Sequence, residues 1–402
     1  MQKIKELLQK LKLHLKEEGI GETFHIVIHY VQLQIRNQKV KMTDYWNKKS
    51  PSEEEKPVVN IITAIPYYDV GGGQRASQLT KTFQRMGYYV RYLYAEYSYD
   101  KKLENIEIPA QVHMRITEQT VERLKQEVKT EELFVFESPL REFLPLLEIA
   151  ASKDCRIVYE NIDNWETSLG RKFFQEETLR NFLEEADILS GTAKPLVEQL
   201  ETYLERFKIP KKPILYLPNA VDGEIFCGEK KYEKPQDLIL GEKTFLYYGS
   251  LWGEWFDWDL ILGLAQKNPK YSINLIGNTE GIRSRLKSCP DNIHFLGLKA
   301  QTELPAYLQH ADYALLPFKT GAIGDYVSPL KIFEYIAMHA KVLCTTLPDI
   351  KQYPNLYFGD SAEEWEEIVK RDPKVDIAAA EAFTEQNTWE SRILALQQGW
   401  SR

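Results

Sequence analysis

Short apolar runs alternate with longer amphipathic stretches over most of the chain, beginning at Val58. Residues 58–66 (VVNIITAIP) are rich in β-branched side chains and end at a proline, which is typical of a buried parallel strand. A glycine turn and a helical stretch follow, and apolar runs then return at 88–94, 133–136, 156–159 and 188–191. This alternation predicts a doubly wound α/β domain, in which helices cover both faces of a parallel sheet.

The same alternation restarts after a polar stretch at residues 228–243. The expected strands are the runs TFLYYG, YSINLIG, NIHFLG, DYALLPF and KVLCTT, separated by helical patterns. The sequence therefore predicts two Rossmann-like domains, over residues 57–212 and 213–385, which face a cleft. Ligands of such sheets bind beyond the carboxyl ends of the strands, so candidate site residues are expected directly after each strand.

The first 56 residues have a different pattern, which predicts a helical N-terminal extension and a linker. Leucine and isoleucine recur at helical spacing between residues 4 and 15, with lysines around them, as in a basic amphipathic helix. A second helical stretch is expected over 22–36, and 48–57 reads as a polar linker. Residues 1–41 either contact an anionic membrane surface or pack on the protein, and three glutamates that dilute the positive charge slightly favour packing.

Composition places the chain among cytoplasmic globular proteins. Of the 402 residues, 43% are hydrophobic and 27% are charged, and the net charge of -8 argues against general nucleic-acid binding. The four cysteines are widely spaced without a CxxC pair, which indicates free thiols in a reducing compartment. No signal-peptide pattern and no run of about 20 apolar residues is present, so we expect a soluble protein or one peripheral to the inner face of the membrane.

Three consecutive glycines, Gly71, Gly72 and Gly73, follow the first expected strand and lead into a helix that contains Leu79 and Phe83. Glycine lets the backbone approach a ligand closely, and a helix N-terminus attracts an anion. The segment is therefore either a phosphate or sugar contact or simply a flexible turn.

The segment 312–346 carries the strongest indication of chemistry. A strand ends at Pro317, and Ser328 and Pro329 are suited to be the N-cap and first residue of the next helix. Lys331 lies in the first turn, where a cation opposes the helix dipole unless an anion binds there. Glu334 shares its face and suits a ribose diol. The alternative, an ordinary Lys–Glu pair on the surface of a helix, is less favoured because the two residues are expected at the mouth of the cleft.

The sequence predicts neither a metal nor a cofactor. His25 and His29 are four residues apart on an expected helix, a spacing that can bind a metal, but no third ligand is indicated.

Four segments in order resemble family 4 of the retaining glycosyltransferases, which have the two-domain GT-B fold. These segments are LPNAVD, YYGSLWGEWFDWDLI, NIHFLGLKAQTELPAYLQHADYALLPF and SPLKIFEYIAMHAKVLCTTLPD, and the resemblance covers residues 58 to about 400. It implies a transferase of bacterial surface-polysaccharide synthesis that uses a nucleoside-diphosphate sugar, with a C-terminal helix (386–402) that crosses back to the N-terminal domain. A dTDP- or UDP-linked donor, such as dTDP-rhamnose, is the expectation from similar enzymes.

The resemblance also implies roles for single residues. Glu334 matches the carboxylate expected on the donor ribose, and Lys331 with the Ser328 backbone matches the diphosphate site. The remaining residues expected around the donor are Gly71, Gly72, Gly73, Arg75, Gly249, Trp252, Gly277, Asp325, Tyr326, Pro329 and Leu330. Asp163 is expected on the acceptor side, to orient the acceptor or act near the reacting carbon, with Glu137 as a second candidate. For both carboxylates a solvated or helix-capping role is the alternative.

The sequence departs from the family pattern in two places. Tyr326 stands where many members have a first glutamate that holds the donor sugar, and Asp325 or Ser328 could substitute for it. The usual Arg and Lys after the first C-domain strand are absent, while Trp252 and Trp255 either stack on a sugar or base or pack on the sheet.

These departures keep other functions open beside glycosyl transfer to a glycan or lipid-linked glycan. One alternative is a nucleotide-sugar epimerase, and another is a catalytically silent GT-B subunit that binds a partner or glycan. A homodimer is compatible with the sequence, which does not determine the assembly.

Overall fold

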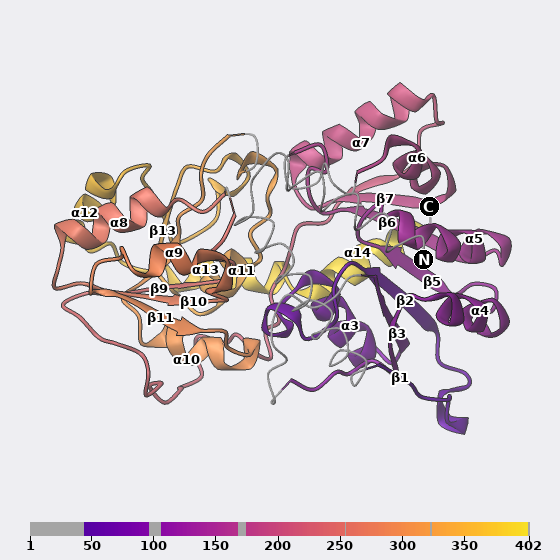
Figure 1. Ribbon diagram of the computed structural model, residues 1–402, viewed down its shortest axis with the longest axis horizontal. Helices are drawn as coiled ribbons and strands as arrows, with labels where there is room; N and C mark the ends of the chain where they lie inside the picture. Colours follow the sequence, from indigo (N-terminus) through magenta and orange to yellow (C-terminus); the bar gives the residue numbers. More distant parts are fainter. Residues whose placement is uncertain (1–43, 96–105, 168–173, 254, 322–323, 401–402) are drawn as a thin grey trace, which may run out of the picture.

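The computed structural model describes residues 44–95, 106–167, 174–253, 255–321 and 324–400. The two helices predicted before residue 37 lie outside these residues. The described chain forms two α/β lobes that lie side by side (Figure 1).

The N-terminal lobe is built on an eight-stranded sheet with the strand order β1-β4-β3-β2-β5-β6-β7-β8. The neighbouring strands pair in parallel except β1, which runs antiparallel to β4. The strands are β1 (Tyr45–Trp46), β2 (Val58–Thr63), β3 (Tyr89–Tyr94), β4 (Val112–Arg115), β5 (Leu133–Phe136), β6 (Arg156–Asn161), β7 (Ile188–Gly191) and β8 (Ile214–Tyr216). The helices are α3 (Arg75–Arg85), α4 (Glu118–Glu127), α5 (Leu144–Ser152), α6 (Glu176–Glu185) and α7 (Lys194–Phe207).

The C-terminal lobe is built on a six-stranded parallel sheet with the order β11-β10-β9-β12-β13-β14. The strands are β9 (Thr244–Tyr248), β10 (Ser272–Ile276), β11 (Ile293–Gly297), β12 (Tyr313–Leu316), β13 (Val342–Cys344) and β14 (Leu356–Phe358). The helices are α8 (Trp258–Lys267), α9 (Arg283–Leu286), α10 (Leu304–Gln309), α11 (Leu330–Ala337), α12 (Ala362–Arg371) and α13 (Ile377–Gln386).

The predicted fold class, two doubly wound parallel-sheet domains, is confirmed. In each sheet the strand order reverses beside the first parallel strand of the lobe, at β2 in one and β9 in the other. Such reversal points are where open α/β sheets bind ligands, beyond the carboxyl ends of the strands. The fold therefore brings the loops after β2 and β9 to the positions where a site is expected.

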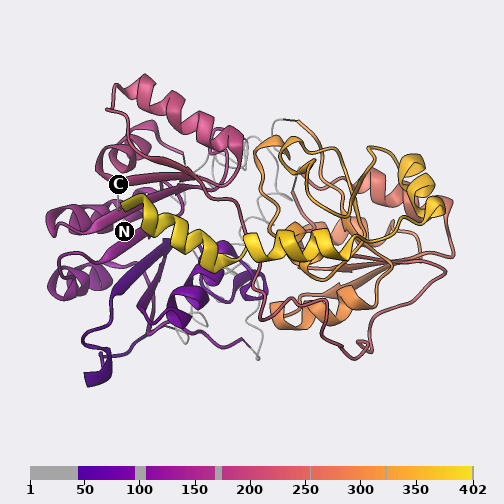
Figure 2. The ribbon, with the colours of Figure 1, turned by 180° about the vertical axis from the view of Figure 1, so that it is seen from behind.

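The chain crosses between the lobes twice, and the two crossings touch. Val221 pairs with Thr388 as an isolated parallel bridge, and Val221 N donates a hydrogen bond to Asn387 O at 2.9 Å. The second crossing leads into α14 (Trp389–Trp400), whose first turn is capped by the Thr388 hydroxyl, which accepts a hydrogen bond from Ser391 N at 3.1 Å. Figure 2 shows α13 and α14 in succession along the back of the molecule, from the C-terminal lobe onto the N-terminal lobe.

Helix α14 completes the core of the N-terminal lobe. Its apolar side chains Trp389, Ile393 and Leu396 are buried in one cluster with Ile61 of β2 and Phe83 of α3. No helix among the described residues combines the length and apolar character needed to cross a membrane.

We expect Trp389→Ala to lower the free energy of unfolding by about 3–5 kcal/mol, because removal of a buried tryptophan loses apolar contacts and leaves a cavity. Trp389 is only 1% exposed, whereas Leu394 on the same helix is 44% exposed. Leu394→Ala is the matched control and should cost less than about 1 kcal/mol. Urea denaturation followed by tryptophan fluorescence and circular dichroism measures both, and equal losses would show that α14 does not belong to the core of the lobe.

Candidate functional site

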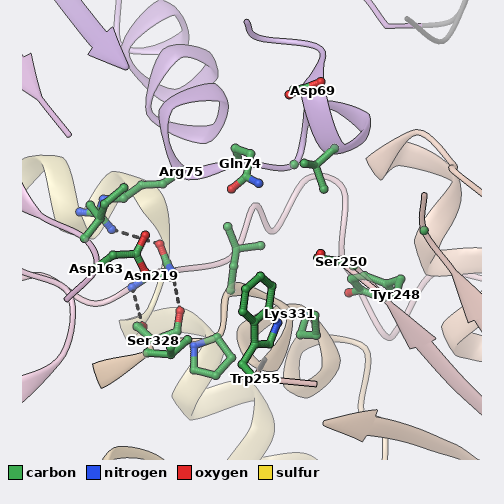
Figure 3. A pocket seen from close by; sticks show the side chains of 18 of the residues that line it. Asp69, Gln74, Arg75, Asp163, Asn219, Tyr248, Ser250, Trp255, Ser328 and Lys331 are labelled. Atoms are coloured by element: carbon green, nitrogen blue, oxygen red, sulfur yellow. Dashed lines mark hydrogen bonds between the residues drawn. The ribbon is translucent and has the colours of Figure 1, made fainter. Parts of the chain in front are cut away.

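A cavity of about 580 Å³ lies between the two lobes and receives side chains from both. The N-terminal lobe contributes the loop after β2, the start of α3 and the loop after β6. The C-terminal lobe contributes the loops after β9 and β10 and the segment that leads into α11. Figure 3 shows this arrangement, with Asp163 and Arg75 from one lobe and Lys331 and Trp255 from the other.

Helix α11 points its N-terminus into this cavity, and residues 326–331 line it. The first turn of any α-helix leaves backbone N–H groups without intrahelical partners, so this end can receive an anion. The helix begins at Leu330 with Pro329 at the N-cap position, one residue later than the sequence predicted. Ser328 is therefore not the N-cap: its hydroxyl instead accepts a hydrogen bond from Asn219 N at 3.1 Å, and its carbonyl accepts one from Asn219 Nδ2 at 2.6 Å.

Lys331 is a cation held in this cavity without a partner of opposite charge. Its ammonium forms no hydrogen bond or ion pair with the residues that the structure describes, and it lies over the rings of Tyr247 and Phe318, at 5.3 and 4.9 Å from their centroids. Burial lowers the pKa of Lys331 to about 8, and the nearby Glu334 carboxylate opposes that shift. A cation that is partly removed from water without a counter-ion is costly, and a bound anion would reduce the cost.

Glu334 lies one turn further along α11 and is 2% exposed. Each of its oxygens accepts one hydrogen bond: Oε2 from the Tyr248 hydroxyl at 2.6 Å and Oε1 from Gln301 Nε2 at 2.7 Å. Burial raises the pKa of Glu334 to about 7, although both hydrogen bonds and the lysines nearby act to lower it. The carboxylate keeps further acceptor capacity toward the cavity that it lines.

Two glycines allow the loops around Lys331 to come together. A Cβ on Gly249 (φ +134°) would lie 3.0 Å from Lys331 Cε, and one on Gly277 (φ +159°) would lie 2.2 Å from Gly249 O. Trp252 and Trp255 also line the cavity, with ring centroids 5.9 Å apart, and Trp252 is 45% exposed. Trp252 thus does not simply pack on the sheet.

The three glycines of the loop after β2 have different surroundings. Gly73 lines the cavity, whereas Gly71 (φ +68°) lies against the other lobe, where an added Cβ would be 2.2 Å from Lys299 O. Gly72 faces Tyr67 and Ile106 within its own lobe. The backbone of Gly71 therefore serves a contact between the lobes.

Arg75 lies at the cavity wall, and its positive charge is already paired with a carboxylate of the protein. Its guanidinium donates to both oxygens of Glu160, at 3.1 and 2.7 Å, and to Asn219 Oδ1 at 3.3 Å. The Glu160 carboxylate raises the pKa of Arg75 against the opposing effect of burial. Arg75 thus offers little net charge to a bound phosphate and holds the junction loop in place.

The two carboxylates expected on the acceptor side occupy different depths. Asp163, in the loop after β6, lines the cavity with an exposed side chain, and partial desolvation between the lobes raises its pKa. Glu137, after β5, lies beneath the wall with its Oε2 accepting a hydrogen bond from the Thr63 hydroxyl at 2.7 Å. Burial, followed by the neighbouring Glu160, raises the pKa of Glu137 to about 8.

Of the two residues proposed to replace the missing first glutamate, neither is aimed clearly at the cavity. Asp325 is not among the lining residues, and its Oδ1 accepts a hydrogen bond from Gly321 N at 3.2 Å within its own loop. Ser328 lines the cavity, but its hydroxyl is bound to Asn219. Tyr326 itself lines the cavity.

Metal binding receives no structural support in the part of the chain that the structure describes, where no three His, Cys, Asp or Glu side chains gather. Asp257 and Asp259 form an Asp-x-Asp triplet, but Asp257 caps α8 by accepting a hydrogen bond from Leu260 N at 3.0 Å. His25 and His29 lie outside the described residues.

Two facing doubly wound lobes, with a cavity between them that holds a helix N-terminus, define the GT-B fold of glycosyltransferases. Over 278 residues the chain is 26% identical to a Bacillus subtilis (strain 168) protein named as a teichuronic acid biosynthesis glycosyltransferase, TuaH; the match spans 64% of this chain and 66%, just under two thirds, of that protein. No family model matches the sequence.

Solved structures support the same fold. The sucrose-phosphate synthase of Thermosynechococcus elongatus superposes with a TM-score of 0.60 at 11% identity, over 86% of this chain and 98% of that one. HepE of Anabaena in complex with UDP superposes with a TM-score of 0.60 at 13% identity, over 86% and 99% of the two chains. The same HepE has also been solved in complex with UDP-glucose.

The two polar residues that bind Glu334 were not anticipated from sequence. Tyr248 directly precedes Gly249, and the alternation of side chains along β9 was the available signal for it. Gln301 begins a short 3-10 helix (Gln301–Glu303) between β11 and α10, and its local sequence carries no comparable signal. Both contact Glu334.

Proposed function

We propose that this protein is a retaining glycosyltransferase that moves a sugar from a UDP- or dTDP-linked donor to a glycan acceptor of a bacterial surface polysaccharide. The observation that carries the proposal is Lys331, a half-buried cation at the N-terminus of α11, which lines the cavity one turn from Glu334 and forms no ion pair with the described residues. The similarity to TuaH supports the polysaccharide setting. The UDP and UDP-glucose complexes of HepE support the class of donor.

The reaction breaks the bond between the anomeric carbon and the diphosphate, whose oxygen keeps the electron pair. Lys331 and the α11 N-terminus would stabilise the negative charge that grows on this oxygen. The acceptor hydroxyl forms the new bond to the anomeric carbon, and its proton passes to the departing diphosphate. Glu334 would accept hydrogen bonds from the donor ribose, and Asp163 would orient the acceptor.

A thermal-shift panel of UDP, dTDP, GDP and their sugars, on the wild type and Glu334→Ala, tests the proposal. We expect one nucleotide to raise the melting temperature of the wild type and not that of the variant. If no nucleotide at millimolar concentration stabilises the wild type, a catalytically silent GT-B subunit replaces the proposed transferase.

Donor affinity should depend on pH as a bell with its maximum between about 7 and 8. Burial raises the pKa of Glu334 to about 7, so the carboxylate is protonated, and a weaker acceptor, at lower pH. Burial lowers the pKa of Lys331 to about 8, so affinity falls above this pH as the ammonium loses its proton. Calorimetric titration of the nucleotide sugar from pH 6 to 9.5 measures both limbs.

Two variants test which residue causes the fall in affinity on each side of this pH profile. Lys331→Arg should raise affinity at alkaline pH relative to the wild type, because the guanidinium stays charged there. Glu334→Gln should remove the acid limb, and an unchanged acid limb would contradict the role of Glu334.

A further inference from the structure

A chain of hydrogen bonds crosses from the N-terminal lobe to Glu334. Lys81 Nζ and Gln78 Nε2, both on α3, each donate to Gln301 Oε1 at 2.7 Å. Gln301 Nε2 in turn donates to Glu334 Oε1 at 2.7 Å. Lys81 does not line the cavity, and its ammonium also lies 3.8 Å from Asp222 Oδ2, so its hydrogen-bonded link to the site runs through Gln301.

The chemistry of Lys81 fixes the orientation of the Gln301 amide. An ammonium group donates hydrogen bonds and cannot accept them, so the Gln301 atom that faces it must be the carbonyl oxygen. The amide nitrogen then has to face Glu334, where it meets a carboxylate. Gln78 adopts the matching orientation, and its own Oε1 is left buried without a hydrogen-bond partner among the described residues.

This chain exists because the two lobes approach each other closely beside it. The backbone of Gly71 leaves no room for a side chain next to Lys299 O, two residues before Gln301. Val70 and Gly71 both have left-handed φ angles, +49° and +68°, which turn the loop against the other lobe. The segment at Gln301 thereby comes within reach of α3.

We propose that Lys81 is a positioning residue for the donor site: through Gln301 it orients the Glu334 carboxylate, so the ribose-binding group is complete only when the lobes are together. This inference rests on the proposed function, because it assigns Glu334 to the nucleotide. It makes the N-terminal lobe, by way of a residue that does not touch the donor, a determinant of donor affinity.

A double-substitution cycle tests the proposal on the full chain. Calorimetry with UDP, dTDP and GDP compares the wild type, Lys81→Met, Glu334→Ala and the double variant. We expect Lys81→Met to weaken nucleotide binding about tenfold, as the loss of a charge-assisted hydrogen bond would. It should have no further effect once Glu334 is alanine. Equal losses in both backgrounds would overturn the proposal, because Lys81 would then act independently of Glu334.

Three further variants separate positioning from charge and from folding. Lys153→Met makes the same charge change at an exposed site of the same lobe and should bind nucleotide as the wild type does. Lys81→Arg, which keeps a donor-only cation, should recover most of the affinity. Gln301→Leu interrupts the chain of hydrogen bonds at its middle and should weaken nucleotide binding as much as Lys81→Met does. It therefore replaces Lys81→Met in the test if Lys81→Met folds poorly. Wild-type affinity in Gln301→Leu would also overturn the proposal.

The proposal can fail separately from the proposed function. If the wild type binds nucleotide and Glu334→Ala does not, but Lys81→Met binds as the wild type does, the donor site stands and the positioning role is wrong. If the wild type binds no nucleotide, the proposed function is wrong. The urea midpoints of unfolding of the same four proteins then decide whether Lys81 and Glu334 are coupled. If the shift in the double variant equals the sum of the two single shifts, the coupling is rejected.

Discussion

Lys331→Met should lower kcat by about 100- to 1000-fold, as removal of one preorganised group that stabilises a developing oxyanion does. The loss in kcat should exceed the loss in donor affinity, because the charge on the departing diphosphate is larger in the transition state than in the bound donor. Release of nucleoside diphosphate from the donor found in the thermal-shift panel measures it.

The same substitution should leave the protein as stable as the wild type or make it more stable. Methionine has a similar length and carries no charge, so burying it avoids the desolvation of an unpaired ammonium. Lys374→Met, at an exposed position of the same lobe, is the control for the change in net charge. A variant that loses stability in step with activity would contradict a direct role of Lys331 in the reaction.

Glu334→Ala should weaken nucleotide binding by about 100-fold, because two hydrogen bonds from a ribose diol to a carboxylate are lost in a buried site. The ribose does not change during the reaction, so the loss should appear in the dissociation constant and KM, with a smaller change in kcat. Calorimetric titration and steady-state kinetics measure the two quantities.

Glu385→Ala is the control for this variant, since Glu385 is exposed on α13 of the same lobe. Glu334→Gln keeps the shape of the side chain and should lose less affinity than the alanine variant. If Glu334→Ala changes kcat and leaves nucleotide affinity intact, the carboxylate acts at the reacting centre and its assignment to the ribose is wrong.

The interior strands could be predicted because buried parallel strands are continuous apolar runs. Leu133–Phe136 and Ile188–Gly191 have the bounds that the sequence indicated. The missed strands were short or partly polar and lie toward the sheet edges, as β4 (Val112–Arg115) and β14 (Leu356–Phe358) do. A strand near an edge is buried on fewer sides, and its apolar pattern is correspondingly weaker.

The candidate site was predictable only where a local pattern marks it. The Ser-Pro-x-Lys start of α11 gave Lys331 and Glu334, and the structure places both at the cavity. The partners of these residues come from distant parts of the chain: Gln301 is 33 positions from Glu334, and 223 positions from Gln78. Likewise, the ion pair that occupies the guanidinium of Arg75 joins it to Glu160, 85 positions away. No local pattern encodes such pairs.

The double crossing between the lobes determines the order in which they can be finished during synthesis. The sheet of the N-terminal lobe leaves the ribosome first, yet Trp389, Ile393 and Leu396 belong to its core. The residues of the C-terminal sheet, 244–358, all emerge before these side chains do. The lobe that is made first is therefore completed last, and until then it exposes an apolar face that chaperones would recognise.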